Sequence, residues 1–138
     1  MKQALHHVTV ETRGQGFIDI TEMLADRIAA EAISRGLLTV WCRHTSASLV
    51  VQENADPDVR ADLEAFFQRL VPEAARYRHA AEGSDDMPAH IRAALTVTQV
   101  SVPVEDGRLA LGMWQAIYLF EHRATPRQRE LVLHLIGE

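Results

Sequence analysis

The last third of the chain constrains the fold most, because it reads as a succession of short strands separated by turn residues. The strands are expected at 97–104, 108–112, 114–122 and 129–136. The first two flank Asp106-Gly107, a pair typical of tight hairpin turns. This part of the chain therefore predicts an antiparallel sheet.

Further strands are predicted in the first part of the chain, where apolar residues alternate with polar ones or form short runs. They are expected at 5–12, 17–20, 37–44 and 46–53. The segment 46–53 is either the continuation of 37–44 or its hairpin partner. Both alternatives add strands to an already strand-rich chain.

Three helices are predicted from apolar residues at helical spacing and from capping residues. The segment 21–36 has Thr21 as its cap and Gly36 as its end. The second helix has the clearest start, because Asp56 stands at the N-cap position and a proline follows it. The third is a short helix over 88–95.

These elements fit one domain that covers residues 1–138. A chain of 138 residues, 47% of them hydrophobic, can bury a core without disulfides or metal staples. The predicted fold class is α+β, with a largely antiparallel β-sheet or sandwich and helices packed in the middle of the chain.

The charge and the cysteine content exclude several classes of protein. A net charge of -5 argues against a nucleic-acid partner. No segment has the apolar length of a membrane span, and the N-terminus has no apolar core of a secretory signal. The single cysteine, Cys42, rules out an intrachain disulfide and suits a reducing compartment. We therefore expect a cytoplasmic protein with no membrane or nucleic-acid contact.

The first candidate site follows the strand that ends at His44. Three hydroxyl residues come next: Thr45, Ser46 and Ser48. An imidazole and hydroxyls at the end of a buried strand could hold a metal or an anionic ligand. The alternative is a polar turn whose hydroxyls satisfy backbone groups.

The second candidate site is the segment HAAEGSDDMPAH, residues 79–90. Two histidines, His79 and His90, bracket three carboxylates, and Gly83 would allow the segment to fold back. Together with His44 they could form a three-histidine site for zinc or a similar ion. The alternative for Asp85 and Asp86 is that they cap the following helix.

Polar residues beside the second helix and before a late strand complete the candidates. They are Glu53, Asn54, Asp56, Trp114 and Gln115. An anion could bind near a helix N-terminus, and an amide beside an indole is a usual pocket lining. The alternatives are an exposed charge for Glu53, a helix cap for Asp56 and a core position for Trp114.

Taken in order, these motifs resemble one family. HTSASL and VQENADPDVR are followed by YRHAAEGSDDMPAHI, then by GRLALGMWQAIYLFEHR and a terminal GE. The chain resembles the YjbQ-like family, which includes secondary thiamine-phosphate synthases, from about His44 to Glu138. The resemblance implies an α+β fold of its own type, a homotrimer and a polar cleft that can hold a metal.

The resemblance also assigns roles to the candidate residues. It implies metal ligation by His44, His79 and His90, and catalytic roles for Glu53, Asp86 and Gln115. Substrate contacts are expected from Thr45, Ser46, Ser48, Asn54, Asp56, Asp85 and Trp114. The implied activity is that of a transferase, which joins hydroxymethylpyrimidine pyrophosphate to thiazole phosphate.

The metal ion that each function needs distinguishes the synthase reading from its alternatives. Histidine ligands favour zinc, whereas a pyrophosphate substrate is usually served by magnesium. A zinc-dependent hydrolase of a small substrate is therefore the alternative enzyme. A trimer that binds a metal or a small anion without catalysis, or a purely structural trimer, is the alternative outside catalysis.

Overall fold

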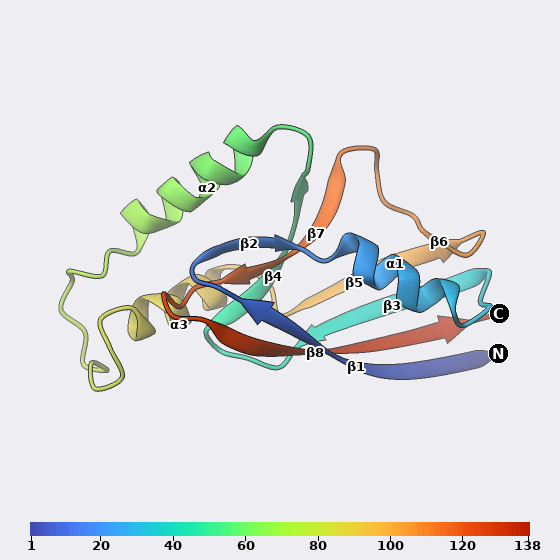
Figure 1. Cartoon of the computed structure of the whole chain (residues 1–138), viewed down its shortest axis with the longest axis horizontal. Helices are drawn as coiled ribbons and strands as arrows, with labels where there is room; N and C mark the ends of the chain where they lie inside the picture. Colours follow the sequence, from blue (N-terminus) through green and yellow to red (C-terminus); the bar gives the residue numbers. More distant parts are fainter.

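Two antiparallel sheets form the framework of the computed structural model, which describes residues 1–138 (Figure 1). The larger sheet has the order β1 (Lys2–Thr12), β8 (Arg127–Gly137), β3 (Arg35–Cys42), β5 (Gln99–Glu105), β6 (Arg108–Leu109). The smaller has the order β2 (Gly16–Asp19), β7 (Gln115–Glu121), β4 (Ala47–Glu53). Every strand pair is antiparallel, as the sequence predicted.

Three helices complete the fold: α1 (Thr21–Ala29), α2 (Pro57–Leu70) and α3 (Asp86–Leu95). In Figure 1, α1 lies over the larger sheet, α2 stands at the periphery, and α3 lies beside the beginning of β4. None of these helices has both the length and the apolar character needed to cross a membrane. The α+β class with mostly antiparallel strands is confirmed.

The core lies between the inner faces of the sheets and α1. Strand β5 buries alternate residues, and Val100, Val102 and Val104 point inward. Leu24 and Ile28, one turn apart on α1, cover the same core. Period-two and helical patterns in the sequence therefore correspond to the buried faces.

Two turn and cap predictions are confirmed. Asp106 and Gly107 have φ angles of 50° and 72°, the left-handed conformation that a two-residue hairpin turn requires. The Asp56 carboxylate accepts a hydrogen bond from the backbone N–H of Asp58 at 2.9 Å and caps α2.

The predicted limits of the first helix are wrong. It ends at Ala29, and Gly36 belongs to β3, where a Cβ atom would lie 2.2 Å from the carbonyl oxygen of Ile136. Gly36 therefore permits close strand contact and does not end a helix. Thr21 is not the cap, because its hydroxyl accepts a hydrogen bond from the Ile117 N–H.

The pairing predicted for 46–53 is also wrong. Strand β4 is neither a continuation nor a hairpin partner of β3, because it belongs to the smaller sheet and pairs with β7. The chain crosses from one sheet to the other between Cys42 and Ala47. This crossing places 43–46 at the edge where α3 begins to pack.

Candidate metal centre

Two histidines and an aspartate converge at the beginning of α3. His90 lies four residues after Asp86 on this helix, so both side chains share one face. His79 comes from the preceding segment. Asp86 Oδ2 lies 2.6 Å from His79 Nε2 and 3.2 Å from His90 Nε2. The three potential ligand atoms all lie within 4.8 Å of one another.

The hydrogen bond at the other ring nitrogen of His90 fixes its tautomer. Nδ1 lies 2.9 Å from the backbone carbonyl oxygen of Thr45 and must carry a proton to donate to it. In the neutral ring, Nε2 then presents a lone pair to the carboxylate of Asp86. Two lone pairs repel each other, so a proton or a metal cation has to lie between them.

The carboxylate of Asp86 is buried and ionised. Only 2% of the residue is exposed. Burial raises the pKa of Asp86, but the hydrogen bond with His79 and the charge of Arg123 outweigh burial, and the pKa lies below its ordinary value. Two imidazole nitrogens and a carboxylate oxygen form a ligand set that zinc uses in catalytic sites.

Arg123, just after β7, holds the carboxylates in place and was not among the predicted residues. Its Nη1 donates to Asp86, its Nε donates to Asp85 at 3.1 Å, and its Nη2 donates to the carbonyl oxygen of Glu82 at 2.9 Å. The sequence gives no signal for these contacts, because they join segments far apart in the chain. Asp85 stands at the N-cap position of α3, as the capping alternative expected, but neither aspartate side chain makes a capping hydrogen bond.

His44 is not brought into this group. Its Nε2 accepts a hydrogen bond from the backbone N–H of Glu130 at 2.7 Å. Burial, followed by the charge of Arg129, lowers the pKa of His44 and favours this neutral, accepting form. Asp86 takes the place that the three-histidine hypothesis gave to His44.

His44 and His90 nevertheless line the same cavity, of about 270 Å³. Its other walls come from Thr45 and Ala47 before and in β4, from α3, and from Thr98. The cavity therefore adjoins the cluster of His79, Asp86 and His90, which we call the His–Asp cluster. A small molecule in this cavity would lie beside His90.

The two serines predicted to contact a substrate already form hydrogen bonds inside the protein. Ser46 accepts hydrogen bonds from Arg129 through both its carbonyl oxygen, at 3.1 Å, and its hydroxyl, at 3.0 Å. Ser48 is 1% exposed, and its hydroxyl lies 2.9 Å from His122 Nε2. Their hydroxyls bond to other side chains, and not to the backbone groups that the polar-turn alternative expected.

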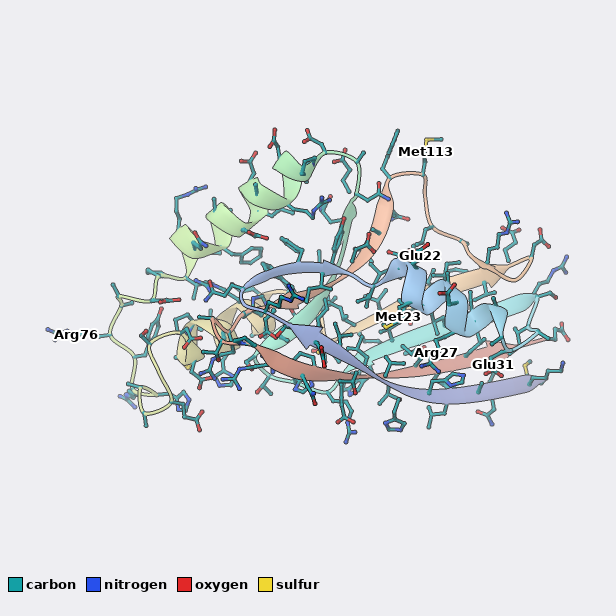
Figure 2. The ribbon with its side chains drawn as sticks, viewed as in Figure 1. Glu22, Met23, Arg27, Glu31, Arg76 and Met113 are labelled. Carbon is teal, nitrogen blue, oxygen red and sulfur yellow. The ribbon has the colours of Figure 1, made fainter.

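The remaining predicted residues lie at the far end of the smaller sheet. Ala47 pairs with Glu121 near the His–Asp cluster, whereas Glu53 pairs with Gln115 six residues further along β4. Six strand residues span about 20 Å. In Figure 2, Met113, close to Gln115 in sequence, lies at the tip remote from α3.

At this far end the side chains serve local structure. Gln115 accepts a hydrogen bond from the Gly112 N–H at 2.8 Å, and Glu53 accepts one from the Asp56 N–H at 3.2 Å. Asn54 is exposed, and Trp114 is 57% exposed. One chain alone does not bring these residues to the His–Asp cluster.

The fold and the cluster define a class: small α+β proteins of two antiparallel sheets with histidines and an aspartate gathered at the start of a helix. Comparison with known proteins identifies the family. Residues 6–138 match the family described as UPF0047 protein YjbQ-like. The chain belongs to this family.

Individual relatives agree over nearly the whole chain. UPF0047 protein sll1880 of Synechocystis is 50% identical over 95% of this chain and 90% of its own length. UPF0047 protein YjbQ of Salmonella typhimurium is 42% identical over 95% and 96%. The crystal structure of a YjbQ/UPF0047 family protein from Clostridium acetobutylicum matches with a TM-score of 0.88 and 34% identity, covering 95% of this chain and 99% of that one.

Proposed function

We propose that the protein is a cytoplasmic, divalent-metal enzyme that joins hydroxymethylpyrimidine pyrophosphate to thiazole phosphate. The observation that carries the metal is the convergence of His79 Nε2 and His90 Nε2 on one oxygen of Asp86. The observation that favours a small substrate is the adjoining cavity of about 270 Å³. The choice of reaction rests on the resemblance of the sequence motifs to thiamine-phosphate synthases.

Zinc is the ion that this ligand set favours. Imidazole suits zinc, and a site with three protein ligands leaves a position open for water or substrate. Magnesium prefers a shell of oxygen atoms and would find one carboxylate here. The backbone carbonyl of Thr45 would act on the ion indirectly, because it keeps the proton of His90 on Nδ1 and leaves Nε2 free.

In the proposed reaction the thiazole nitrogen attacks the methylene carbon of the pyrimidine. The bond from this carbon to the pyrophosphate oxygen breaks, and pyrophosphate leaves with the electron pair. A bound divalent ion would supply charge stabilisation to the leaving oxygen. The chain itself would contribute the cavity walls, His44 and His90, that orient the two substrates.

Zinc-dependent hydrolysis is the second candidate, and a specific observation favours it. No lysine or arginine lines the cavity beside His90, although a pyrophosphate group is usually met by cationic side chains. A small uncharged ester or amide would not need them. The open position on zinc would then hold a water molecule activated for attack.

The decisive experiment measures turnover of both substrate classes after chelation and after return of single metal ions. We expect product only with a divalent ion, and an activity loss of about 100-fold or more in His90→Ala. His7→Ala removes an exposed histidine of β1 and should behave as the parent protein. Turnover that survives chelation would refute the metal-dependent mechanism, and metal binding without any turnover would favour a binding protein.

We also propose a homotrimer, formed with two further copies of this chain. The outer face of the larger sheet exposes 40% of Leu37, 47% of Trp41 and 36% of Ile136. The register places Leu37 beside Ile136 and Trp41 beside Val132, so the apolar side chains adjoin. An apolar sheet face of this kind favours burial against another molecule.

Light scattering at micromolar concentration is expected to give about three times the chain mass of 15.4 kDa. Trp41→Glu should lower this mass, because a carboxylate in an apolar contact is costly. Ala61→Glu, which adds the same charge at an exposed position of α2 outside this sheet, should leave the mass unchanged. A parent protein that stays monomeric would exclude the trimer.

A further inference from the structure

The loop between β6 and β7 holds two large apolar side chains in water. Met113 is 80% exposed and the neighbouring Trp114 is 57% exposed. Figure 2 shows Met113 at the end of this loop, pointing away from the body of the protein. Tryptophan is among the residues that contribute most to binding between proteins. We call Met113 and Trp114 the apolar tip.

Hydrogen bonds hold the apolar tip in one conformation. The backbone N–H of Gln115 donates to the carbonyl oxygen of Gly112 at 3.1 Å, and the Gly112 N–H donates to the side-chain oxygen of Gln115 at 2.8 Å. The Asn54 N–H donates to the carbonyl oxygen of Trp114 at 2.9 Å. A loop that is already fixed loses little conformational entropy when it binds, so the tip is prepared for contact.

A second pair of exposed apolar side chains lies beside the cavity that adjoins His90. Leu95 is 56% exposed and Val97 is 46% exposed. Ala94, directly before Leu95, and Thr98, directly after Val97, line the cavity and are themselves exposed. The cavity therefore opens to solvent beside an apolar rim.

The apolar tip cannot reach the cavity of its own chain. Ala47 lines the cavity at one end of β4, whereas Glu53 at the other end pairs with Gln115, next to the tip. The six residues between them span about 20 Å. Only a second copy can bring a tip to a cavity. Because tip and cavity are different surfaces, the contact is head-to-tail and forms a ring when the rotation closes.

The charges at the two ends of the chain are complementary. The charged side chains beside the apolar tip are three carboxylates and one cation: Glu53, Asp56, Asp58 and Arg60. None of these carboxylates forms a salt bridge. At the other end, Arg76 and Arg78 are exposed, precede His79 of the His–Asp cluster, and form no salt bridge either. This distribution favours head-to-tail contact and opposes contact between two tips.

We infer that the apolar tip of one copy covers the cavity beside His90 of the next copy, so that two subunits build each site. The tip would pack on Leu95 and Val97 and keep water from the cavity. Glu53 and Gln115 would arrive with the tip and face the substrate from the second subunit. The inference rests on the proposed function, and the contact adds to the apolar face of the larger sheet.

The first experiment uses cross-linking and needs no turnover. Met113→Cys and Ala94→Cys are combined in one chain, which keeps Trp114 and both rim residues. The native Cys42 is 1% exposed and stays in place. A short bis-maleimide cannot join the two new thiols within one chain, because they lie at opposite ends of β4. Covalent dimers and trimers are therefore expected on a denaturing gel.

Each single variant should remain monomeric on the same gel, because a head-to-tail contact does not bring two tips or two cavities together. The matched control is Met113→Cys with Glu22→Cys, since Glu22 is an exposed residue of α1. Absence of covalent oligomers in the Met113→Cys, Ala94→Cys variant would overturn the inference. Equal cross-linking in the Glu22→Cys control would overturn it as well.

The second experiment tests the shared site by mixing two variants. Trp114→Glu and His90→Ala are each expected to be inactive, and the two are co-expressed in equal amounts. A site is intact where native His90 of one copy meets native Trp114 of the next, so about a quarter of the parent activity should return. A site built by one chain would return none. Cross-links without any turnover would refute the proposed enzyme and leave the shared contact standing, whereas turnover without cross-links would do the reverse.

Discussion

Arg129→Met is expected to lower the free energy of unfolding by about 3–5 kcal/mol. The side chain of Glu121 is 0% exposed and that of Arg129 is 5% exposed. Arg129 Nε and Nη2 donate to the two carboxylate oxygens of Glu121, at 2.6 and 2.5 Å. The substitution would leave the buried carboxylate of Glu121 without a cation. An uncompensated buried charge is the reason that losing one partner of such a pair destabilises the fold strongly.

Two further variants test this explanation by urea unfolding at pH 7. Arg43→Met breaks an exposed pair with Glu130, about half exposed on each side, and should cost less than about 1 kcal/mol. The double change Glu121→Gln with Arg129→Met should recover part of the loss, because no buried charge remains. A loss no larger than that of Arg43→Met would show that the buried pair contributes little.

The stabilisation by the Glu121–Arg129 pair is expected to decrease as the pH falls. Burial raises the pKa of Glu121, but hydrogen bonds from Arg129 outweigh burial, so the folded pKa is below the ordinary value. The pair therefore stabilises fully above the unfolded pKa, and its contribution is lost as the pH falls through the folded pKa. In Arg129→Met the hydrogen bonds from the Arg123 N–H and from Thr12 remain, but the contribution of Arg129 that opposed burial is lost, so the pKa of Glu121 is expected to rise. The difference between parent and variant should then shrink from pH 7 to pH 4.

The elements of this fold were predictable because each has a local cause. The alternation of Val100, Val102 and Val104 with polar residues indicates a strand, and the carboxylate of Asp56 caps its own helix. Which strands pair with each other, by contrast, is not determined by the local sequence. Strand β4 follows β3 in the chain yet pairs with β7, because its inward residues pack in the smaller sheet. Gly36 illustrates the same limit, since its close neighbour is Ile136.

The candidate site was predictable in part for the same reason. His90 and Asp86 are neighbours on one helix turn, and Gly83, with φ of 112°, allows the preceding loop to turn. Arg123 could not be found, because its contact with Asp86 spans 37 positions of sequence. His44 was grouped with the cluster on residue type and on the family resemblance, whereas its hydrogen bond to Glu130 directs Nε2 elsewhere.

Asp86→Asn is expected to weaken zinc binding by about 100-fold or more. The substitution keeps the shape of the side chain but removes its charge, and an amide oxygen is a poor zinc ligand beside the carboxylate it replaces. Arg123→Met should weaken binding less, by about 10–100-fold, because Arg123 positions the ligand without contacting the ion. Calorimetric titration of metal-free protein with zinc at pH 7 measures both effects.

Asp26→Asn is the matched control, since it removes one exposed carboxylate of α1. It should bind zinc as the parent protein does, which excludes a general effect of net charge. The geometry admits one competing explanation, in which protons alone join His79 and His90 to Asp86. In that case the parent protein would take up no zinc, and Asp86→Asn would change only its stability. If zinc affinity falls from the parent protein to Arg123→Met and falls further in Asp86→Asn, a metal ion must lie between the imidazoles and the carboxylate.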